Sequence, residues 1–63
     1  MLLKVGSRGN EVKQIQEFLG IGADGIFGKG TEFAVKEFQK INGLDDDGIV
    51  GPSTWDCMGL ATT

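Results

Sequence analysis

Residues 45–48, Asp-Asp-Asp-Gly, are the densest group of metal-ligand side chains in the sequence. A calcium-binding EF-hand loop needs alternating oxygen ligands, a glycine after them and a bidentate glutamate at its end. If Gly48 is that glycine, Asp45 and Asp47 fill two ligand positions. However, Gly43 and Thr54 then occupy the places of the first ligand and the closing glutamate. We therefore interpret these carboxylates as turn-forming and solvated, and we expect no metal or other cofactor.

Catalytic side chains are also scarce, because the sequence contains no histidine. Ser-His-Asp and Cys-His arrangements are therefore excluded, and the single cysteine, Cys57, is expected to be buried on a helical face. Glycoside hydrolysis would need two carboxylates on either side of a deep cleft. A chain of 63 residues is too short to enclose a sugar in this way and keep a core. We therefore predict a domain that is not an enzyme.

The charge balance limits the partners. The net charge is −3 and the six lysine and arginine residues are spread along the chain. Binding to nucleic acid or to an anionic membrane needs clustered positive charge, so we expect neither partner. The opening Met-Leu-Leu-Lys is too short to be a signal peptide, and we expect synthesis in the cytoplasm.

The elements that must position any site are marked by an internal repeat. Residues 12–34 align without a gap on residues 35–57, with nine identities in 23 positions. The identical pairs are Val12/Val35, Lys13/Lys36, Gln16/Gln39, Gly20/Gly43, Asp24/Asp47, Gly25/Gly48, Ile26/Ile49, Gly28/Gly51 and Thr31/Thr54. Glycines at the same places indicate a repeated backbone path, so we interpret the copies as two halves of one pseudo-symmetric domain.

Each copy contains a helix followed by a loop. Apolar residues recur at helical spacing in both copies, and Gly20 and Gly43 follow as predicted C-terminal caps. Ser7 is the predicted N-cap of the first helix, and Pro52 suits the first position of the third. We therefore expect helices near 8–19, 29–42 and 52–60. The fold class is all-α: a small three-helix bundle with a 23-residue pseudo-repeat and two Asp-Gly-x-x-Gly loops, in one domain over 1–63, with 61–63 as a tail.

The two loops each carry an Asp-Gly turn signal followed by two apolar residues. These apolar residues could pair as a minimal two-stranded ribbon or fill the core. Thr31 and Thr54, in the first helical turns, are expected to bond the preceding turn. Trp55 takes the place of Glu32 in the repeat, which suggests an exposed face for a sugar to stack on; the alternative is a core position. The same two interpretations apply to Phe27 and Val50, the outer apolar residues of the two loops.

The whole pattern resembles a known family. The segments Gly6-Ser7-x-Gly9-x-x-Val12-x-x-Ile15-Gln16, Asp24-Gly25-Ile26-Phe27-Gly28-x-x-Thr31-x-x-Ala34-Val35-x-x-Phe38-Gln39 and Asp47-Gly48-Ile49-Val50-Gly51-Pro52-x-Thr54-Trp55 are similar to the peptidoglycan-binding domains of bacterial cell-wall hydrolases and phage endolysins. The resemblance covers about residues 4 to 60. It implies a three-helix, non-catalytic anchor that binds the glycan strand or stem peptide of peptidoglycan beside a linked hydrolase, as in a phage-type endolysin. It also implies action at the bacterial cell wall.

The candidate ligand surface is the one formed by the two loops and the helix starts after them. Its expected members are Asp24, Phe27, Gly28, Lys29, Asp47, Gly51, Ser53 and Trp55. Backbone amides at the helix starts would donate to a carboxylate or sugar oxygen, and the aromatic rings would give apolar contact. The aspartates would shape the turns or accept from sugar hydroxyls or an amine. Two alternatives stay open: a protein–protein adaptor resembling a protease pro-segment, and a structural spacer. A monomer is expected.

Overall fold

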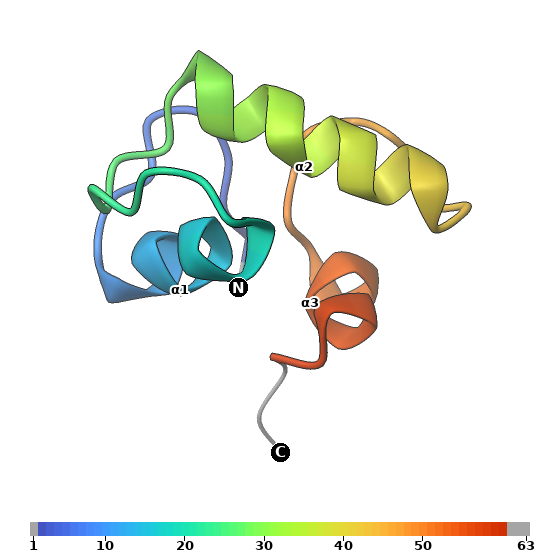
Figure 1. Ribbon diagram of the computed structural model, residues 1–63. Helices are drawn as coiled ribbons and strands as arrows, with labels where there is room; N and C mark the ends of the chain where they lie inside the picture. Colours follow the sequence, from blue (N-terminus) through green and yellow to red (C-terminus); the bar gives the residue numbers. More distant parts are fainter. Residues whose placement is uncertain (1, 61–63) are drawn as a thin grey trace.

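The computed structural model describes residues 2–60, which form three helices (Figure 1). These are α1 (Asn10–Leu19), α2 (Lys29–Ile41) and α3 (Pro52–Met58). The all-α, three-helix prediction is confirmed, while the predicted tail over 61–63 lies outside the described residues. Among the described helices, none has the length and apolarity needed to cross a membrane.

The start of α1 differs from the prediction. Gly9, with φ 126°, is the N-cap, and no side chain caps the helix. Ser7 instead accepts a hydrogen bond from Phe27 N through its carbonyl (2.9 Å) and from Lys4 N through Oγ (3.1 Å). The chain is therefore still extended at Ser7, and the helix begins only at Asn10.

Two helices end at a glycine, and Gly20 is the C-cap of α1 as predicted, whereas the C-cap of α2 is Asn42, one residue before the predicted Gly43. Gly20 and Gly59 lie in the left-handed region, with φ 74° and 73°, and end α1 and α3. Gly59 stops α3 at Met58, before the predicted end at residue 60, whereas α2 ends one residue before its predicted end. A left-handed residue turns the chain away from the helix axis and lets later amides reach the last carbonyls.

The core is made by one side of each helix together with residues between them. Its buried apolar members are Leu3, Val12, Ile15, Phe27, Val35, Val50, Trp55 and Met58, with Leu19, Phe38 and Leu60 packed against them. Two residues of the helical apolar pattern are largely outside: Phe18 is 45% exposed and Ile41 is 80% exposed. The Phe18 ring meets that of Phe38 edge-on, with centroids 5.5 Å apart.

Cys57 corrects a prediction, because its side chain is exposed rather than buried. The buried residues of α3 are Thr54, Trp55 and Met58. Successive helical residues are about 100° apart around the axis. Cys57 therefore falls on the outer side of α3, beside the stripe that Trp55 and Met58 direct into the core.

The segment before α1 holds the two halves of the chain together. Leu3 exchanges backbone hydrogen bonds with Val50 (3.1 and 2.8 Å), while Gly6 N and Ser7 O bond Phe27 (3.0 and 2.9 Å). The two isolated antiparallel bridges pair Leu3 with Val50 and Arg8 with Ile26. The apolar loop residues thus pair with this segment and not with each other, so the ribbon alternative is wrong. Phe27 and Val50, at 1% and 0% exposure, fill the core.

Candidate functional site

A buried glutamine organises the first Asp-Gly loop. Gln16, on α1, is 1% exposed. The two hydrogens on its Nε2 are shared among three oxygens within hydrogen-bond distance: Asp24 Oδ1 (2.9 Å), the Ile26 carbonyl (3.0 Å) and Thr31 Oγ1 (3.0 Å). Its Oε1 accepts from the Gly25 amide at 2.8 Å. One side chain therefore fixes the loop to the helix before it and to the helix after it.

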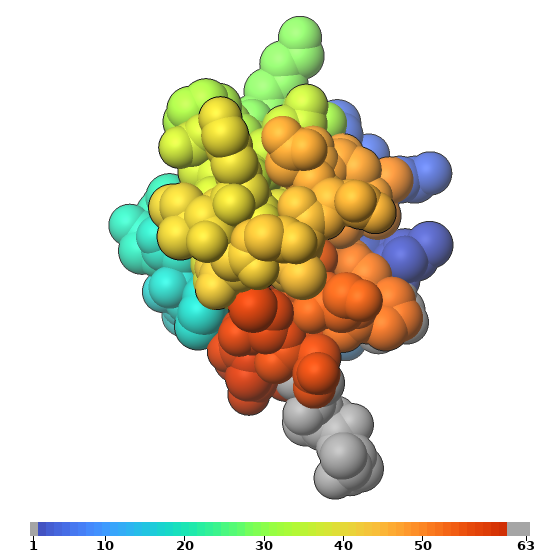
Figure 2. All heavy atoms as spheres, turned by 90° about the vertical axis from the view of Figure 1, so that its right-hand side faces the viewer, coloured from blue at the N-terminus to red at the C-terminus, as the bar shows by residue number. Residues whose placement is uncertain are grey.

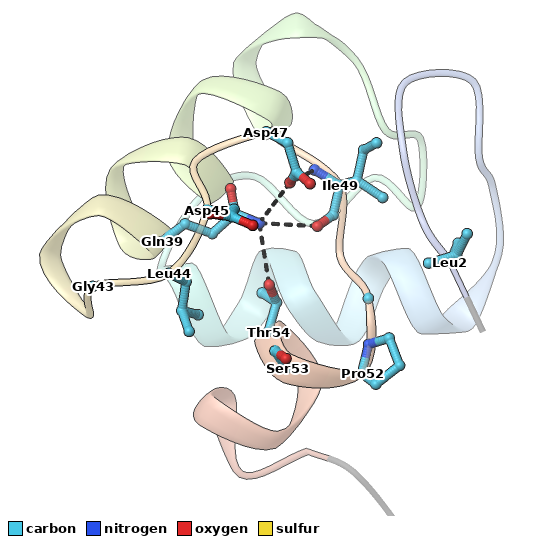
Figure 3. A pocket seen from close by; sticks show the side chains of 11 residues that line it. Leu2, Gln39, Gly43, Leu44, Asp45, Asp47, Ile49, Pro52, Ser53 and Thr54 are labelled. Atoms are coloured by element: carbon cyan, nitrogen blue, oxygen red, sulfur yellow. Dashed lines mark hydrogen bonds between the residues drawn. The ribbon is translucent and has the colours of Figure 1, made fainter.

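The second loop carries the same set of bonds 23 residues later, around Gln39 of α2 (Figure 3). The two hydrogens on Gln39 Nε2 are shared in the same way among Asp47 Oδ1 (3.2 Å), the Ile49 carbonyl (2.9 Å) and Thr54 Oγ1 (3.1 Å). Gln39 Oε1 accepts from the Gly48 amide at 3.0 Å. The amide meets the general requirement that a buried polar group be hydrogen-bonded.

The two loop aspartates face their own backbones. Asp24 Oδ1 accepts from Ile26 N and Asp47 Oδ1 accepts from Ile49 N, each at 2.9 Å. The Ile26 amide, and then the Gln16 side chain, hold the pKa of Asp24 below its ordinary value of 3.8. One oxygen of each carboxylate is therefore committed to the turn, which is the shaping role expected of Asp24 and Asp47.

Thr31 and Thr54 have a structural role, but with a different partner from the one expected. Both are buried, at 6% and 4% exposure. Their hydroxyl oxygens accept from Gln16 and Gln39, respectively, which lie on the helices before the loops. Each threonine thus links the start of one helix to the body of the preceding helix across the loop.

The two aromatic candidates belong to the core. Phe27 is 1% exposed and Trp55 is 8% exposed. The indole Nε1 is also buried, and it has no hydrogen-bond partner among the described residues. Neither ring therefore presents an open face for a sugar, and for both residues the core alternative is confirmed.

A groove of about 400 Å³ lies beside the start of α3, and we call it the α3 groove (Figure 3). It is lined by Leu2, Gln39, Gly43, Leu44, Asp45, Asp47, Ile49, Gly51, Pro52, Ser53 and Thr54. Figure 3 shows Leu44 toward one side and Leu2 toward the other, with the Gln39 bonds between them. The volume is within the usual range for small-ligand sites. The lining combines apolar side chains, two carboxylates, two hydroxyls and the Gln39 amide, and it includes no lysine or arginine.

Figure 2 views the molecule from the side of this second loop. The C-terminal end of α2 (yellow) and the segment that follows it (orange) lie next to α3 (red). The second copy of the repeat therefore supplies most of this face.

The α3 groove brings together only three of the predicted site residues: Asp47, Gly51 and Ser53. The first-copy candidates Asp24, Gly28 and Lys29 do not line it. Gly28 is the N-cap of α2 and Lys29 its first residue, and no side chain caps that helix start. The α3 groove thus contains candidates from the second copy and none from the first.

Eight lining residues were not among the predicted site residues: Leu2, Gln39, Gly43, Leu44, Asp45, Ile49, Pro52 and Thr54. Asp45 was interpreted as a solvated turn carboxylate and not as a ligand-binding residue, although it lies beside the second loop in the sequence. Leu2 reaches the groove because Leu3 pairs with Val50, and the Leu2 side chain packs near Gly51. That pairing joins segments far apart in the sequence, so local sequence patterns do not predict it.

Comparisons with known proteins agree with this fold. A family profile described as “Putative peptidoglycan binding domain” matches residues 8–58. The structure superposes on a fused Zn-dependent amidase/peptidase/peptidoglycan-binding domain-containing protein from Clostridium acetobutylicum with TM-score 0.91 and 37% identity, covering 100% of this chain and 31% of that one. A peptidoglycan-binding protein from Clostridioides difficile, in complex with glutamine hydroxamate, gives 0.91 and 44%, covering 94% and 40%.

A further match has similar quality. The Burkholderia AP3 phage endolysin gives TM-score 0.89 and 38% identity, covering 92% of this chain and 24% of that one. No curated protein matches the sequence. The chain spans about a third of the first relatives it matches, at 31% and 40% of their lengths. With 51 residues, 8–58, inside the family profile, the chain belongs to the peptidoglycan-binding domain family.

Proposed function

We propose that this domain binds bacterial peptidoglycan without catalysing a reaction, and that it anchors a linked cell-wall hydrolase, of the phage endolysin type, to its substrate. This proposal rests on the close structural match to parts of longer proteins, including an amidase/peptidase fusion and an endolysin. The matched part makes up 24–40% of each of those chains. A tethered binding domain raises the concentration of its neighbour near the polymer, even if each contact is weak. The site of action would be the bacterial cell wall.

We place the main contact in the α3 groove. Sugar hydroxyls or the amine of a stem peptide would hydrogen-bond to Asp45, to the Ser53 hydroxyl and to the Asp47 oxygen that is not bonded within the turn. The apolar parts of the ligand would pack against Leu2, Leu44 and Pro52. The amides of Gly51 and Ser53 belong to the same helix start. The start of α2, with the amides of Gly28 and Lys29 and the carboxylate of Asp24, would make a second, separate contact.

The two halves of the domain would then share the same loop structure but make different contacts with the ligand. Their matched glutamine networks support a pseudo-symmetric origin for the two loops. Where the second copy has Asp45, Pro52 and Ser53, the first has Gly22, Lys29 and Gly30. The surface beside the second loop is therefore acidic and apolar, whereas the surface beside the first loop has a basic residue and two glycines.

Co-sedimentation with insoluble peptidoglycan sacculi tests the proposal, using wild-type protein with Asp45→Asn and Asp46→Asn variants at low and high salt. Both variants remove one negative charge from an exposed side chain, but only Asp45 lines the groove. We expect wild-type binding to persist in salt, Asp45→Asn to weaken it and Asp46→Asn to leave it unchanged.

The outcomes separate binding from its location. If both variants bound as well as wild type, the α3 groove would not be the contact surface, and the anchoring function would still stand. Absence of wild-type binding to sacculi of several chemical types would reject the anchor. The protein–protein adaptor would then be the better reading, with the exposed Phe18 and Ile41 as the first surface to probe.

A further inference from the structure

Asn42 and Gly43 form the only Asn-Gly pair in the sequence, and they directly follow the last residue of α2. The side-chain carbonyl carbon of asparagine is electrophilic, and the backbone nitrogen of the next residue can close a five-membered ring on it. Glycine places no Cβ beside that nitrogen. We propose that Asn42 is a site of spontaneous deamidation, and that its conversion to isoaspartate rebuilds the end of α2.

The reaction needs only water. The Gly43 nitrogen gives up its proton to solvent and forms a bond to Asn42 Cγ. The Cγ–Nδ2 bond breaks, and the amide nitrogen leaves as ammonia with protons from solvent. Water then opens the succinimide at one of its two carbonyls, which yields aspartate or isoaspartate. Nothing is oxidised or reduced, and one amide is exchanged for one carboxylate.

The local structure leaves this pair open to the reaction. Asn42 and Gly43 are both exposed, and nothing lies within 4 Å of a Cβ built at Gly43. Three hydrogen bonds hold the turn: Asn42 N and Nδ2 donate to the Phe38 carbonyl (3.1 and 2.8 Å), and Gly43 N donates to Lys40 O (3.2 Å). Solvent-exposed bonds at a helix end open readily, and their opening frees the Gly43 nitrogen.

The other pairs capable of this ring closure are protected by the glutamine networks. In Asp24-Gly25 and Asp47-Gly48, the glycine nitrogens donate to Gln16 and Gln39 at 2.8 and 3.0 Å. Gly48 is buried and Gly25 is partly buried, and both nitrogens are engaged by a buried glutamine.

The other asparagine provides an internal comparison. Asn10 is exposed, but it is followed by Glu11, whose Cβ lies beside the attacking nitrogen. Its peptide bond to Glu11 is also part of the first turn of α1. Asn10 should therefore stay intact under conditions that convert Asn42.

Conversion of Asn42 disturbs the helix end in two ways. A carboxylate replaces a donor at the negative end of the helix dipole, and the Nδ2 bond to the Phe38 carbonyl is lost. In isoaspartate the backbone also gains a methylene just before Gly43. That extra length strains the Leu44 N to Gln39 O bond (2.8 Å), which returns the chain to the core after α2.

Peptide mapping by mass spectrometry of the purified domain, after incubation in warm neutral buffer, tests the assignment. We expect conversion at Asn42 with isoaspartate as the main product, while Asn10 stays intact. The separated isoaspartate form should melt about 4–8 °C below the unmodified domain, the shift for loss of one helix-end contact in a domain of this size. Asn42→Asp carries the same charge on a normal backbone and should melt between the two.

A matched variant, Asn42→Gln, has the same amide on a longer side chain and should remain unconverted. Conversion at Asn42 no faster than at Asn10 would overturn the site. An isoaspartate form that melts with the unmodified domain would overturn the structural effect. Both readouts are independent of peptidoglycan, so they stand or fall apart from the proposed function.

Discussion

Gln39 links four polar groups of the domain through hydrogen bonds from a single side chain. A Gln39→Leu substitution keeps a similar volume but leaves Asp47, Gly48 and Thr54 without this partner. We expect the free energy of unfolding to fall by about 2–4 kcal/mol, because buried polar groups are then left unsatisfied. Since a core of this size supplies about 3–5 kcal/mol, the variant should be largely unfolded. Urea denaturation measures the change.

The control for this substitution is Gln14→Leu, an exposed position on α1. A surface change of this kind should alter stability by less than about 0.5 kcal/mol. If Gln39→Leu and Gln14→Leu proved equally stable, the buried glutamine network would not be a main source of stability.

Asp24 gives a pH dependence with a defined sign. Hydrogen bonds from Ile26 N and Gln16 lower the pKa of its carboxyl in the folded state below the ordinary value of 3.8. The unfolded chain therefore takes up this proton at higher pH than the folded one. The stabilisation from ionised Asp24 is complete above the ordinary value and is lost as the pH falls through the lowered pKa.

Asp24→Asn keeps an oxygen that accepts the same bonds but removes the titration. We expect its stability to fall less steeply with acid than that of wild type, in urea unfolding measured across this pH range. A carbon NMR titration of the Asp24 carboxyl should give a pKa below 3.8. A pKa at or above the ordinary value would contradict the assigned bonds.

At the residue level, the sequence predicted some site features and missed others for identifiable reasons. The loop aspartates were recognisable as turn formers from the Asp-Gly pairs alone. The buried roles of Gln16 and Gln39 were missed because a polar residue in an amphipathic helix suggests a surface position, although their identity in both copies was a visible signal. Trp55 was uncertain because the repeat aligned it with Glu32, which is itself half-buried.

At the level of elements, the glycine after α1 sets where the helix stops. Gly20 has φ 74° and nothing within 4 Å of a built Cβ, so Gly20→Ala adds backbone strain but no clash. We expect it to lower the free energy of unfolding by about 1–2 kcal/mol, the usual cost of a left-handed conformation for a residue with a Cβ. Thermal or urea unfolding measures this loss.

Gly22→Ala is the matched comparison two residues further on. Gly22 also has open space around its built Cβ but no positive φ. Its substitution should be close to neutral, or slightly stabilising through the unfolded state. Equal losses in the two variants would show that the left-handed turn is not what makes Gly20 necessary.

Helix positions were the most predictable part of the fold, because caps and apolar spacing are local signals. The ends of α1 and α2 and the starts of α2 and α3 lie within a residue of their predicted places. The start of α1 was not predicted because Ser7 is held by Phe27, a contact between separate segments. The α3 groove was only partly predicted for the same reason: Leu2 enters it through pairing across the chain.

At the scale of the whole molecule, an anchor should help an enzyme only on an insoluble substrate. We expect that fusing this domain to a peptidoglycan hydrolase without a wall-binding module will raise its rate on sacculi by increasing local concentration. The rate on small soluble wall fragments should not change. Turbidity loss of sacculi and release of product from fragments measure the two rates.

The control fusion carries the Asp45→Asn domain, with circular dichroism to verify its fold. It should give a smaller gain on sacculi than the wild-type fusion. An equal gain on soluble fragments and sacculi would mean that the domain acts on the enzyme itself and does not act by tethering it.

The bond between Leu3 and Val50 also bears on when the domain can form during synthesis. Leu3 leaves the ribosome early and Val50 late, so the first residues must wait for nearly the whole domain before they find their partner. Closing so long a loop carries an entropic cost that local helix formation does not. The α1 segment can become helical early in synthesis, but the core is complete only after Val50 emerges. Chains stalled before that point should remain accessible to proteases and chaperones.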